Sequence, residues 1–93
     1  MIARRSIYSG RVQGVGFRFS TKQIATGFDV LGWVKNLPDG TVELQVKGEA
    51  DEVEEFLLEI RENSSLAHYI QEFDETEIPL SDLEGVTGFT ITR

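Results

Sequence analysis

Several short stretches of the chain alternate between apolar and polar residues, which is the pattern of half-buried β-strands. The most regular runs from Thr41 to Lys47, with valine or leucine at every second position. It follows the apolar, β-branched segment Val30 to Leu37, and Pro38-Asp39-Gly40 joins the two into a predicted hairpin. Further strands are predicted over Ala3 to Arg11, Leu66 to Glu75 and Phe89 to Arg93. In the segment from Leu66 to Glu75, two alternating sets of apolar residues could each face the core, so the sequence leaves the register of this strand open.

Two other segments repeat their apolar residues every three or four positions, as one face of a helix does. The first runs from Phe17 to Phe28, with Thr21 and Ile24 on the same face and Gly27 near its end. The second runs from Asp51 to Arg61, with an apolar stripe of Val53, Phe56, Leu57 and Ile60. Acidic residues crowd its first turn, where the helix dipole favours negative charge.

In chain order these elements read β-α-β-β-α-β, followed by a predicted loop over Glu77 to Val86 and a short C-terminal strand. We therefore expect an α+β, ferredoxin-like sandwich, with two helices on one face of a mostly antiparallel sheet. Residues 1–93 are expected to form a single domain, with the last strand at a sheet edge that Arg93 protects from pairing. Because this fold hosts many functions, the function has to come from a site.

The formal net charge of −7 argues against nucleic-acid binding, which needs basic surface to displace phosphate counterions. Before residue 40 only Asp29 and Asp39 oppose the positive side chains, whereas the later part of the chain is acidic. That distribution suits a small anion held locally, although solvated acidic faces would give the same total. The chain has no cysteine, secretory leader or bilayer-length apolar run. We expect a cytoplasmic protein without disulfides or membrane contact.

A glycine-containing loop lies between the first predicted strand and the first helix. Glycines allow successive N–H groups to converge on one point, and the following helix adds unpaired N–H donors. Arg18 adds a planar fork that can bind two phosphate oxygens. The segment is therefore a candidate phosphate cradle: Gln13-Gly14-Val15-Gly16-Phe17-Arg18. Spacing alone leaves an ordinary turn with a surface arginine equally open.

Other chemistries find less support in the residues. Phe19 occupies the third glycine position of a dinucleotide fingerprint, and no Gly-Lys-Ser/Thr sequence completes a Walker A loop. His68 is the only histidine, so a transition-metal site would need carboxylates alone, and we expect no metal and no cofactor. Phe17 and Phe19 are candidates for the mouth of the site, although aromatic residues at such positions are more often core.

Two long segments resemble the signatures of the acylphosphatase family. The first is Gly10-Arg11-Val12-Gln13-Gly14-Val15-Gly16-Phe17-Arg18, and the second is Gly32-Trp33-Val34-Lys35-Asn36-Leu37-Pro38-Asp39-Gly40-Thr41-Val42-Glu43. The closing residues Gly88 to Arg93 resemble the family's last strand, whereas Asn63 to Val86 depart most from its pattern. The resemblance implies hydrolysis of the carboxyl–phosphoryl anhydride of small acyl phosphates to a carboxylate and inorganic phosphate.

The same resemblance implies roles for particular residues. Arg18 and Asn36 would be catalytic, Arg18 by binding the phosphate and Asn36 by orienting the attacking water. The backbone amides of the loop would bind the substrate phosphate, through Gln13, Gly14, Val15, Gly16 and Phe17. The leaving carboxylate has a conjugate acid of pKa about 4, so no general acid is needed. No side chain is an evident base, and in the family's mechanism the bound phosphate takes the water's proton. Inorganic phosphate is expected as product or inhibitor, and the protein as a monomer.

Alternative functions remain open at this stage. A non-catalytic anion-binding module would use the same loop and Arg18, but it would not need a water-positioning amide at Asn36. An asparagine beside a turn is by itself more typical of local hydrogen bonding. Carbamoyl-phosphate hydrolysis in hydrogenase maturation, where a related domain begins a larger transferase, is disfavoured by the chain's length. Nucleic-acid binding on the sheet is least favoured, given the acidity.

Overall fold

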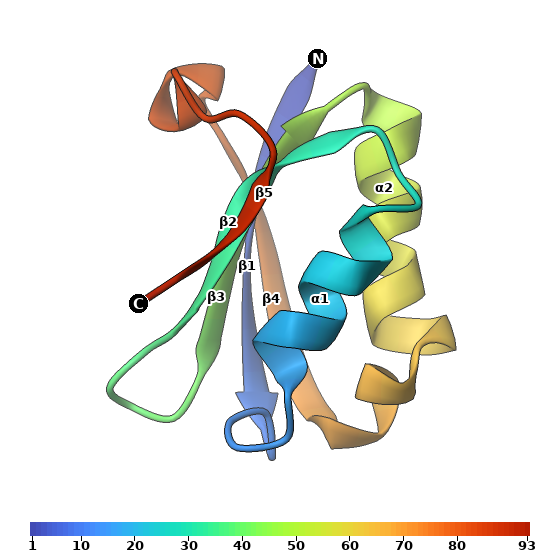
Figure 1. Ribbon diagram of the computed structural model, residues 1–93, viewed down its shortest axis with the longest axis vertical. Coiled ribbons are helices and arrows are strands. Elements are labelled where there is room, and N and C mark those ends of the chain that lie inside the picture. The colour runs from blue at the N-terminus through green and yellow to red at the C-terminus, as the bar shows by residue number, and fades with distance from the viewer.

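A computed structural model describes residues 1–93, and in it two helices cover one face of a five-stranded sheet (Figure 1). The helices are α1 (Phe17–Ala25) and α2 (Ala50–Leu58). The strands are β1 (Ile2–Gly10), β2 (Val30–Asn36), β3 (Val42–Gly48), β4 (Ile70–Ile78) and β5 (Phe89–Thr92). The expected α+β, ferredoxin-like sandwich is confirmed. None of the helices is long and apolar enough to cross a membrane.

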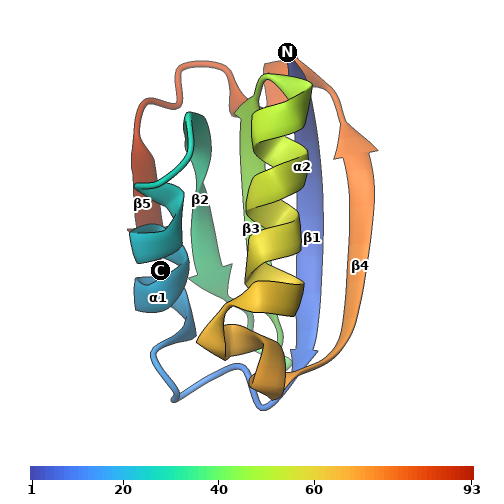
Figure 2. The same ribbon diagram turned by 90° about the vertical axis from the view of Figure 1, so that its right-hand side faces the viewer.

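The order of strands across the sheet is β4-β1-β3-β2-β5. β3 pairs antiparallel with both β1 and β2, and β4 pairs antiparallel with β1. The C-terminal strand β5 lies at one edge, as expected, where it runs parallel to β2. Figure 2 shows α1 in front of β2 and β5, and α2 in front of β3 and β1. The first, second and fifth strands therefore run in the same direction, and their carboxyl ends meet at one end of the sheet.

The core lies between the sheet and the helices and consists of the alternating positions that the sequence assigned inward. Val42, Leu44 and Val46 of β3 are fully buried, and so are Val53 and Phe56 of α2. An aromatic series joins α2 to β5 and to the turn after α1, because the Phe56 ring lies 5.8 Å from Phe28 and 5.6 Å from Phe89. Each such side chain contributes about 1.5–3 kcal/mol of burial free energy, which keeps α2 and β5 in place.

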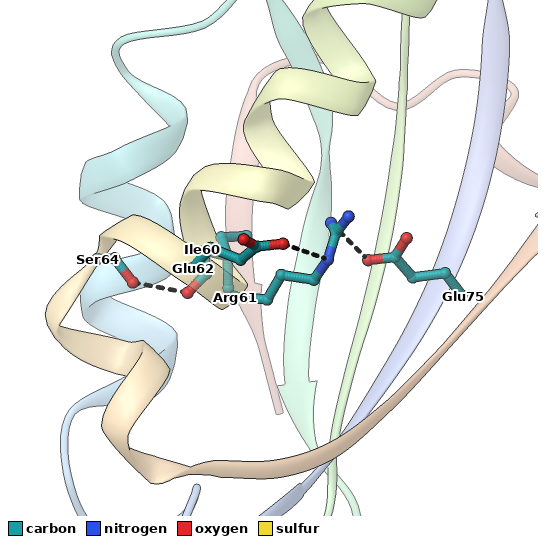
Figure 3. Close-up of polar contacts among 5 residues, drawn as sticks. All are labelled: Ile60, Arg61, Glu62, Ser64 and Glu75. Atoms are coloured by element: carbon teal, nitrogen blue, oxygen red, sulfur yellow. Dashed lines mark hydrogen bonds and ion pairs between the residues drawn. The ribbon is translucent and has the colours of Figure 1, made fainter.

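The segment after α2 differs from the prediction. A π-helical turn (Glu59–Asn63) continues α2, and Ser65–Tyr69 form a 3₁₀ helix where a strand was expected from Leu66. The hydroxyl of Ser64 donates to the Ile60 carbonyl and accepts from the Leu66 amide (Figure 3 draws the Ile60 contact). These local bonds compete with strand pairing and turn Leu66 into the core. The strand β4 therefore starts at Ile70 and includes the first residues of the predicted loop.

Smaller differences concern helix and loop boundaries. The helix α1 ends at Ala25, before the expected Phe28, because the amides of Thr26, Gly27 and Phe28 bond to carbonyls three residues back. The predicted loop after β4 contains a 3₁₀ turn (Leu80–Leu83) whose Leu83 side chain is fully buried. This turn lies over β1 and β3, and the Lys47 ammonium group donates to the Leu83 carbonyl.

The edge strand β4 is attached to the helix layer by Arg61 of the π-helical turn. Arg61 forms an ion pair with Glu75, drawn as a dashed line in Figure 3. The Arg61 Nη1 atom lies 3.2 Å from Glu75 Oε2, and the guanidinium lies 5.1 Å from the Phe73 ring centre. Both side chains of the ion pair are about four-fifths buried, at 21% and 18% exposure. An edge strand with little apolar surface is thus held by a charged contact as well as by its pairing with β1.

A second ion pair lies on the sheet face that the helices leave open. The Arg5 Nε atom lies 2.6 Å from Glu43 Oε2, and Gln45 donates to the same oxygen over 3.1 Å. Burial acts to raise the pKa of the Glu43 carboxyl, but the hydrogen bonds from Arg5 and Gln45 outweigh it and hold that pKa below its ordinary value. A group with a lowered pKa in the folded state stabilises the fold above its unfolded pKa.

Replacing Glu43→Gln is expected to lower the free energy of unfolding by about 1–2 kcal/mol at pH 7, because the charge-assisted bonds are lost. Since the stabilisation by Glu43 disappears as pH falls through its lowered pKa, wild type and variant should become equally stable in acid. Urea unfolding between neutral and acidic pH measures both. The exposed control Glu54→Gln should stay within about 0.5 kcal/mol of wild type at each pH. A Glu43→Gln loss that persists unchanged into acid would contradict the ion-pair account.

Candidate functional site

The candidate site lies at the end of the sheet where β1 and β2 finish. Tyr8 of β1 and Asn36 of β2 both stand opposite Val42 of β3, one on each side. The loop that follows β1 is therefore close to the end of β2, and it leads directly into α1 (Figure 1). The register of the sheet thus brings two segments together that are separate in the sequence.

A pocket of about 190 Å³ opens at this end. It is lined by Val12, Gly14, Gly16, Phe17, Arg18, Phe19, Asn36 and Ile91. Arg18 and Asn36 thus face the same space, beside both loop glycines. Gln13 and Val15, which were expected to contribute backbone amides, are not among the lining residues. Val12, which belongs to the first signature segment, lines the pocket, and so does Ile91, which the sequence did not single out.

The loop reaches its shape through glycine. Gly14 and Gly16 adopt φ values of 77° and 76°, in the left-handed region that other residues rarely occupy. Gly16 is the N-cap of α1, no side chain caps that helix end, and its first turn carries no acidic residue. The positive end of the helix dipole is therefore not neutralised by the protein at the pocket. Together with the guanidinium of Arg18, it makes the pocket suited to an anion.

Phe17 and Phe19 have different places, although they are two residues apart. Phe17 is 2% exposed and its ring packs 5.3 Å from that of Tyr8, so it belongs to the core and to the pocket floor. Phe19 is 62% exposed and lines the pocket from outside the core. Phe17 is therefore a core residue and Phe19 lies at the mouth of the site, so each of the two interpretations holds for one of these side chains.

The start of the loop is fixed against the segment before β4. The Arg11 amide donates to the Tyr69 carbonyl over 3.0 Å, and the pairing of β1 with β4 shifts register between Ser9 and Gly10. Gly10 has a φ of 124°, and a Cβ there would lie 2.5 Å from the Tyr69 carbonyl oxygen. Only glycine allows both this backbone conformation and this approach.

The middle of the loop is fixed by the side chain of Gln13. Its Nε2 amide donates to the carbonyls of Leu37 and Thr41, each over 2.8 Å. These carbonyls belong to the turn between β2 and β3, which begins directly after Asn36. The Leu37 amide also donates to the Thr41 carbonyl, so Gln13 completes a closed turn. Gln13 therefore links the loop that carries Arg18 to the hairpin that carries Asn36, a role that its sequence position did not indicate.

No group of three or more His, Cys, Asp or Glu side chains is placed to hold a metal ion, and His68 lies exposed on the 3₁₀ helix before β4. The pocket is lined instead by an arginine, an asparagine, two glycines of the loop and apolar side chains. Fold and site thus define an α+β domain with a cationic, glycine-built pocket for a small anion.

Comparisons with known proteins agree with that class. The acylphosphatase family model matches residues 4–91. The acylphosphatase of Methanospirillum hungatei is 40% identical over 94% of this chain and 92% of its own length. The crystal structure of acylphosphatase from Bacillus subtilis matches with a TM-score of 0.87 and 34% identity, over 100% of both chains. The HypF structure of T. kodakarensis also matches, with a TM-score of 0.83 and 29% identity, but this chain covers 12% of it. The chain belongs to the acylphosphatase family.

Gly10→Ala is expected to destabilise the fold by about 3–5 kcal/mol, because it combines backbone strain with a clash against the Tyr69 carbonyl. Gly85→Ala is the matched control, since Gly85 has a φ of 80° but no atom within 4 Å of the added Cβ. Strain alone should cost the control about 1–2 kcal/mol. Urea unfolding of both variants measures the difference. Equal losses would show that the close approach at Gly10 contributes nothing.

Gln13→Glu is expected to lower the free energy of unfolding by about 2–3 kcal/mol, because a carboxylate of the same shape cannot donate to two carbonyls and repels them. The control Gln23→Glu makes the same chemical change on the exposed face of α1, and should stay within about 0.5 kcal/mol of wild type. Denaturant unfolding at pH 7 compares the two. If Gln13→Glu is as stable as Gln23→Glu, Gln13 does not hold the loop to the hairpin.

Proposed function

We propose that the chain is an acylphosphatase that hydrolyses the carboxyl–phosphoryl anhydride of small acyl phosphates. Arg18 and the backbone amides of the loop hold the phosphoryl group, and the Asn36 amide orients the attacking water. The observation that carries this proposal is that Arg18 and Asn36, from different elements, line one pocket with Gly14 and Gly16. Membership of the acylphosphatase family supports it.

The reaction needs positioning and charge stabilisation more than proton transfer. The water oxygen forms a bond to phosphorus as the bond from phosphorus to the carboxyl oxygen breaks. The carboxylate leaves without protonation, because its conjugate acid has a pKa of about 4. The guanidinium and the N–H groups at the start of α1 stabilise the negative charge on the equatorial phosphoryl oxygens. The water's proton passes to the phosphate, so the products are a carboxylate and inorganic phosphate.

The pocket's side chains fit a mechanism without a protein base. Histidine and carboxylates are absent from its lining. The nearest buried phenol is that of Tyr8, beneath Phe17, and burial raises the pKa of this group well above its ordinary value. Tyr8 therefore stays protonated at neutral pH and cannot accept the water's proton. Proton transfer to the bound phosphate is the route that remains.

Further features belong to the same proposal. The enzyme works without a metal, as a monomer, in the cytoplasm, and inorganic phosphate is both its product and a competitive inhibitor. A second candidate, a non-catalytic anion-binding module, would use Arg18 and the loop equally well. The placement of Asn36 on the pocket favours hydrolysis, because binding alone does not require a carboxamide beside the phosphate.

Hydrolysis of benzoyl phosphate is expected for the wild type, with and without EDTA. Arg18→Gln and Asn36→Ala should each lower kcat by about 10²–10³-fold, the usual cost of losing one donor to the transition-state charge. Arg4→Gln is the control, because Arg4 lies at the start of β1, at the other end of the sheet. Its rate should stay within about twofold of wild type.

The three outcomes that oppose the proposal are distinct. A wild type that binds phosphate but does not hydrolyse benzoyl phosphate would leave an anion-binding module. Turnover abolished by EDTA would remove the metal-free reaction. An Asn36→Ala enzyme as fast as wild type would take Asn36 out of the mechanism.

A further inference from the structure

Two exposed apolar side chains stand at the rim of the pocket. Phe19, in the first turn of α1, is 62% exposed, and Ile91 of β5 is 38% exposed. Both line the pocket together with Arg18 and Asn36. They come from elements that are in contact, since α1 packs over β5 (Figure 2). The lining therefore combines polar groups with two apolar side chains that remain exposed to solvent.

Neither side chain is explained by the core. The inward face of α1 consists of Phe17, Thr21 and Ala25, which are all buried. Phe19 and Ile91 are outside the main apolar cluster, whereas the neighbouring Phe89 packs against it. A large ring left in water at a binding site gains free energy when a ligand covers it. Its position therefore points to a ligand rather than to folding.

The size of the pocket indicates which part of the ligand would lie there. At about 190 Å³ it is smaller than the ~300–1,000 Å³ of sites that enclose whole small molecules. The phosphoryl group occupies the polar side, beside Arg18 and the glycines. An acyl group bonded to that phosphoryl group then extends out of the pocket, and the exposed apolar side chains that the lining offers it are Phe19 and Ile91.

We propose that Phe19 and Ile91 form an acyl-binding rim, through which the site favours acyl phosphates with a flat, apolar acyl group over those with a small one. The proposal rests on the function proposed above, because it assigns the second half of the same substrate. An aromatic acyl group can pack against the Phe19 ring at offset or edge-to-face geometry, with Ile91 covering its other side. A methyl group in its place would leave most of the ring in water.

The test compares kcat/KM for benzoyl phosphate and acetyl phosphate in wild type, Phe19→Ala, Phe19→Leu and Ile91→Thr. Phe19→Ala is expected to reduce the benzoyl-to-acetyl ratio about tenfold, mainly through the KM for benzoyl phosphate. Phe19→Leu should retain part of the preference, and Ile91→Thr should reduce it less than Phe19→Ala does. Using the ratio of substrates in each enzyme removes the difference in their intrinsic reactivity.

Two controls separate a specificity role from a disturbed site. The inhibition constant of inorganic phosphate, which reports the cradle alone, should change by no more than about twofold in Phe19→Ala. Phe73→Ala removes a similarly exposed ring, 48% exposed, from the opposite edge of the sheet and should leave the ratio unchanged.

The outcomes distinguish this inference from the proposed function. If wild type hydrolyses both substrates and Phe19→Ala leaves their ratio unchanged, the acyl-binding rim is wrong and the acylphosphatase function stands. Equal losses for both substrates in Phe19→Ala, or an equal change of the ratio in Phe73→Ala, would overturn the rim as well. If wild type hydrolyses neither substrate, the function fails and the rim fails with it.

Discussion

The carboxamide of Gln13 holds together the two parts of the site. One nitrogen donates to the carbonyls of Leu37 and Thr41, and so joins the loop before α1 to the β2–β3 turn. The loop leads to Arg18 and the turn begins after Asn36, so both bonds tie the backbone before Arg18 to the backbone after Asn36. A misplacement of about 1 Å can cost about a hundredfold in rate. The fit of this small site therefore depends on a side chain that does not line it.

The sheet topology makes that link possible. Because β1, β2 and β5 run in the same direction, the loop after β1, the end of β2 and the exposed side chain of Ile91 gather at one end of the sheet. The addition of β5 beyond β2 also extends the site on the side away from β4. The four strands of the basic ferredoxin-like order bring the glycine loop and Asn36 to the pocket. The fifth adds Ile91 to the lining, which in the proposed acyl-binding rim meets the acyl group.

Much of this arrangement follows from the sequence, but the parts that depend on tertiary contacts do not. Alternation and helical spacing located β1, β2, β3, β5 and both helices, because each buries one regular face. The prediction failed from Leu66 to Tyr69, where the hydroxyl of Ser64 forms local bonds that no hydrophobic pattern encodes. Residue type and the two signatures predicted Arg18 and Asn36 as site residues, and both line the same pocket. The sequence could not identify Ile91 as a pocket residue, because its position depends on the parallel pairing of β5 with β2. The hydrogen bonds from the Gln13 side chain to the β2–β3 turn could not be predicted either, because no local sequence pattern indicates them.

The acidity of the chain raises the question of how such a protein attracts a phosphorylated anion. The net charge of −7 opposes binding only where its field reaches the pocket. On the acidic strand β4, Glu75 is paired with Arg61, and the side chains of Glu72, Asp74 and Glu77 are exposed to solvent. Exposed charges act through water and its ions, so their repulsion is strongly screened beyond the Debye length of about 8 Å at physiological ionic strength. Arg18 and the uncapped start of α1 act at contact distance, where screening is weak. The groups next to the pocket therefore make its electrostatic potential positive. The acidic surface elsewhere can keep the protein soluble without weakening anion binding.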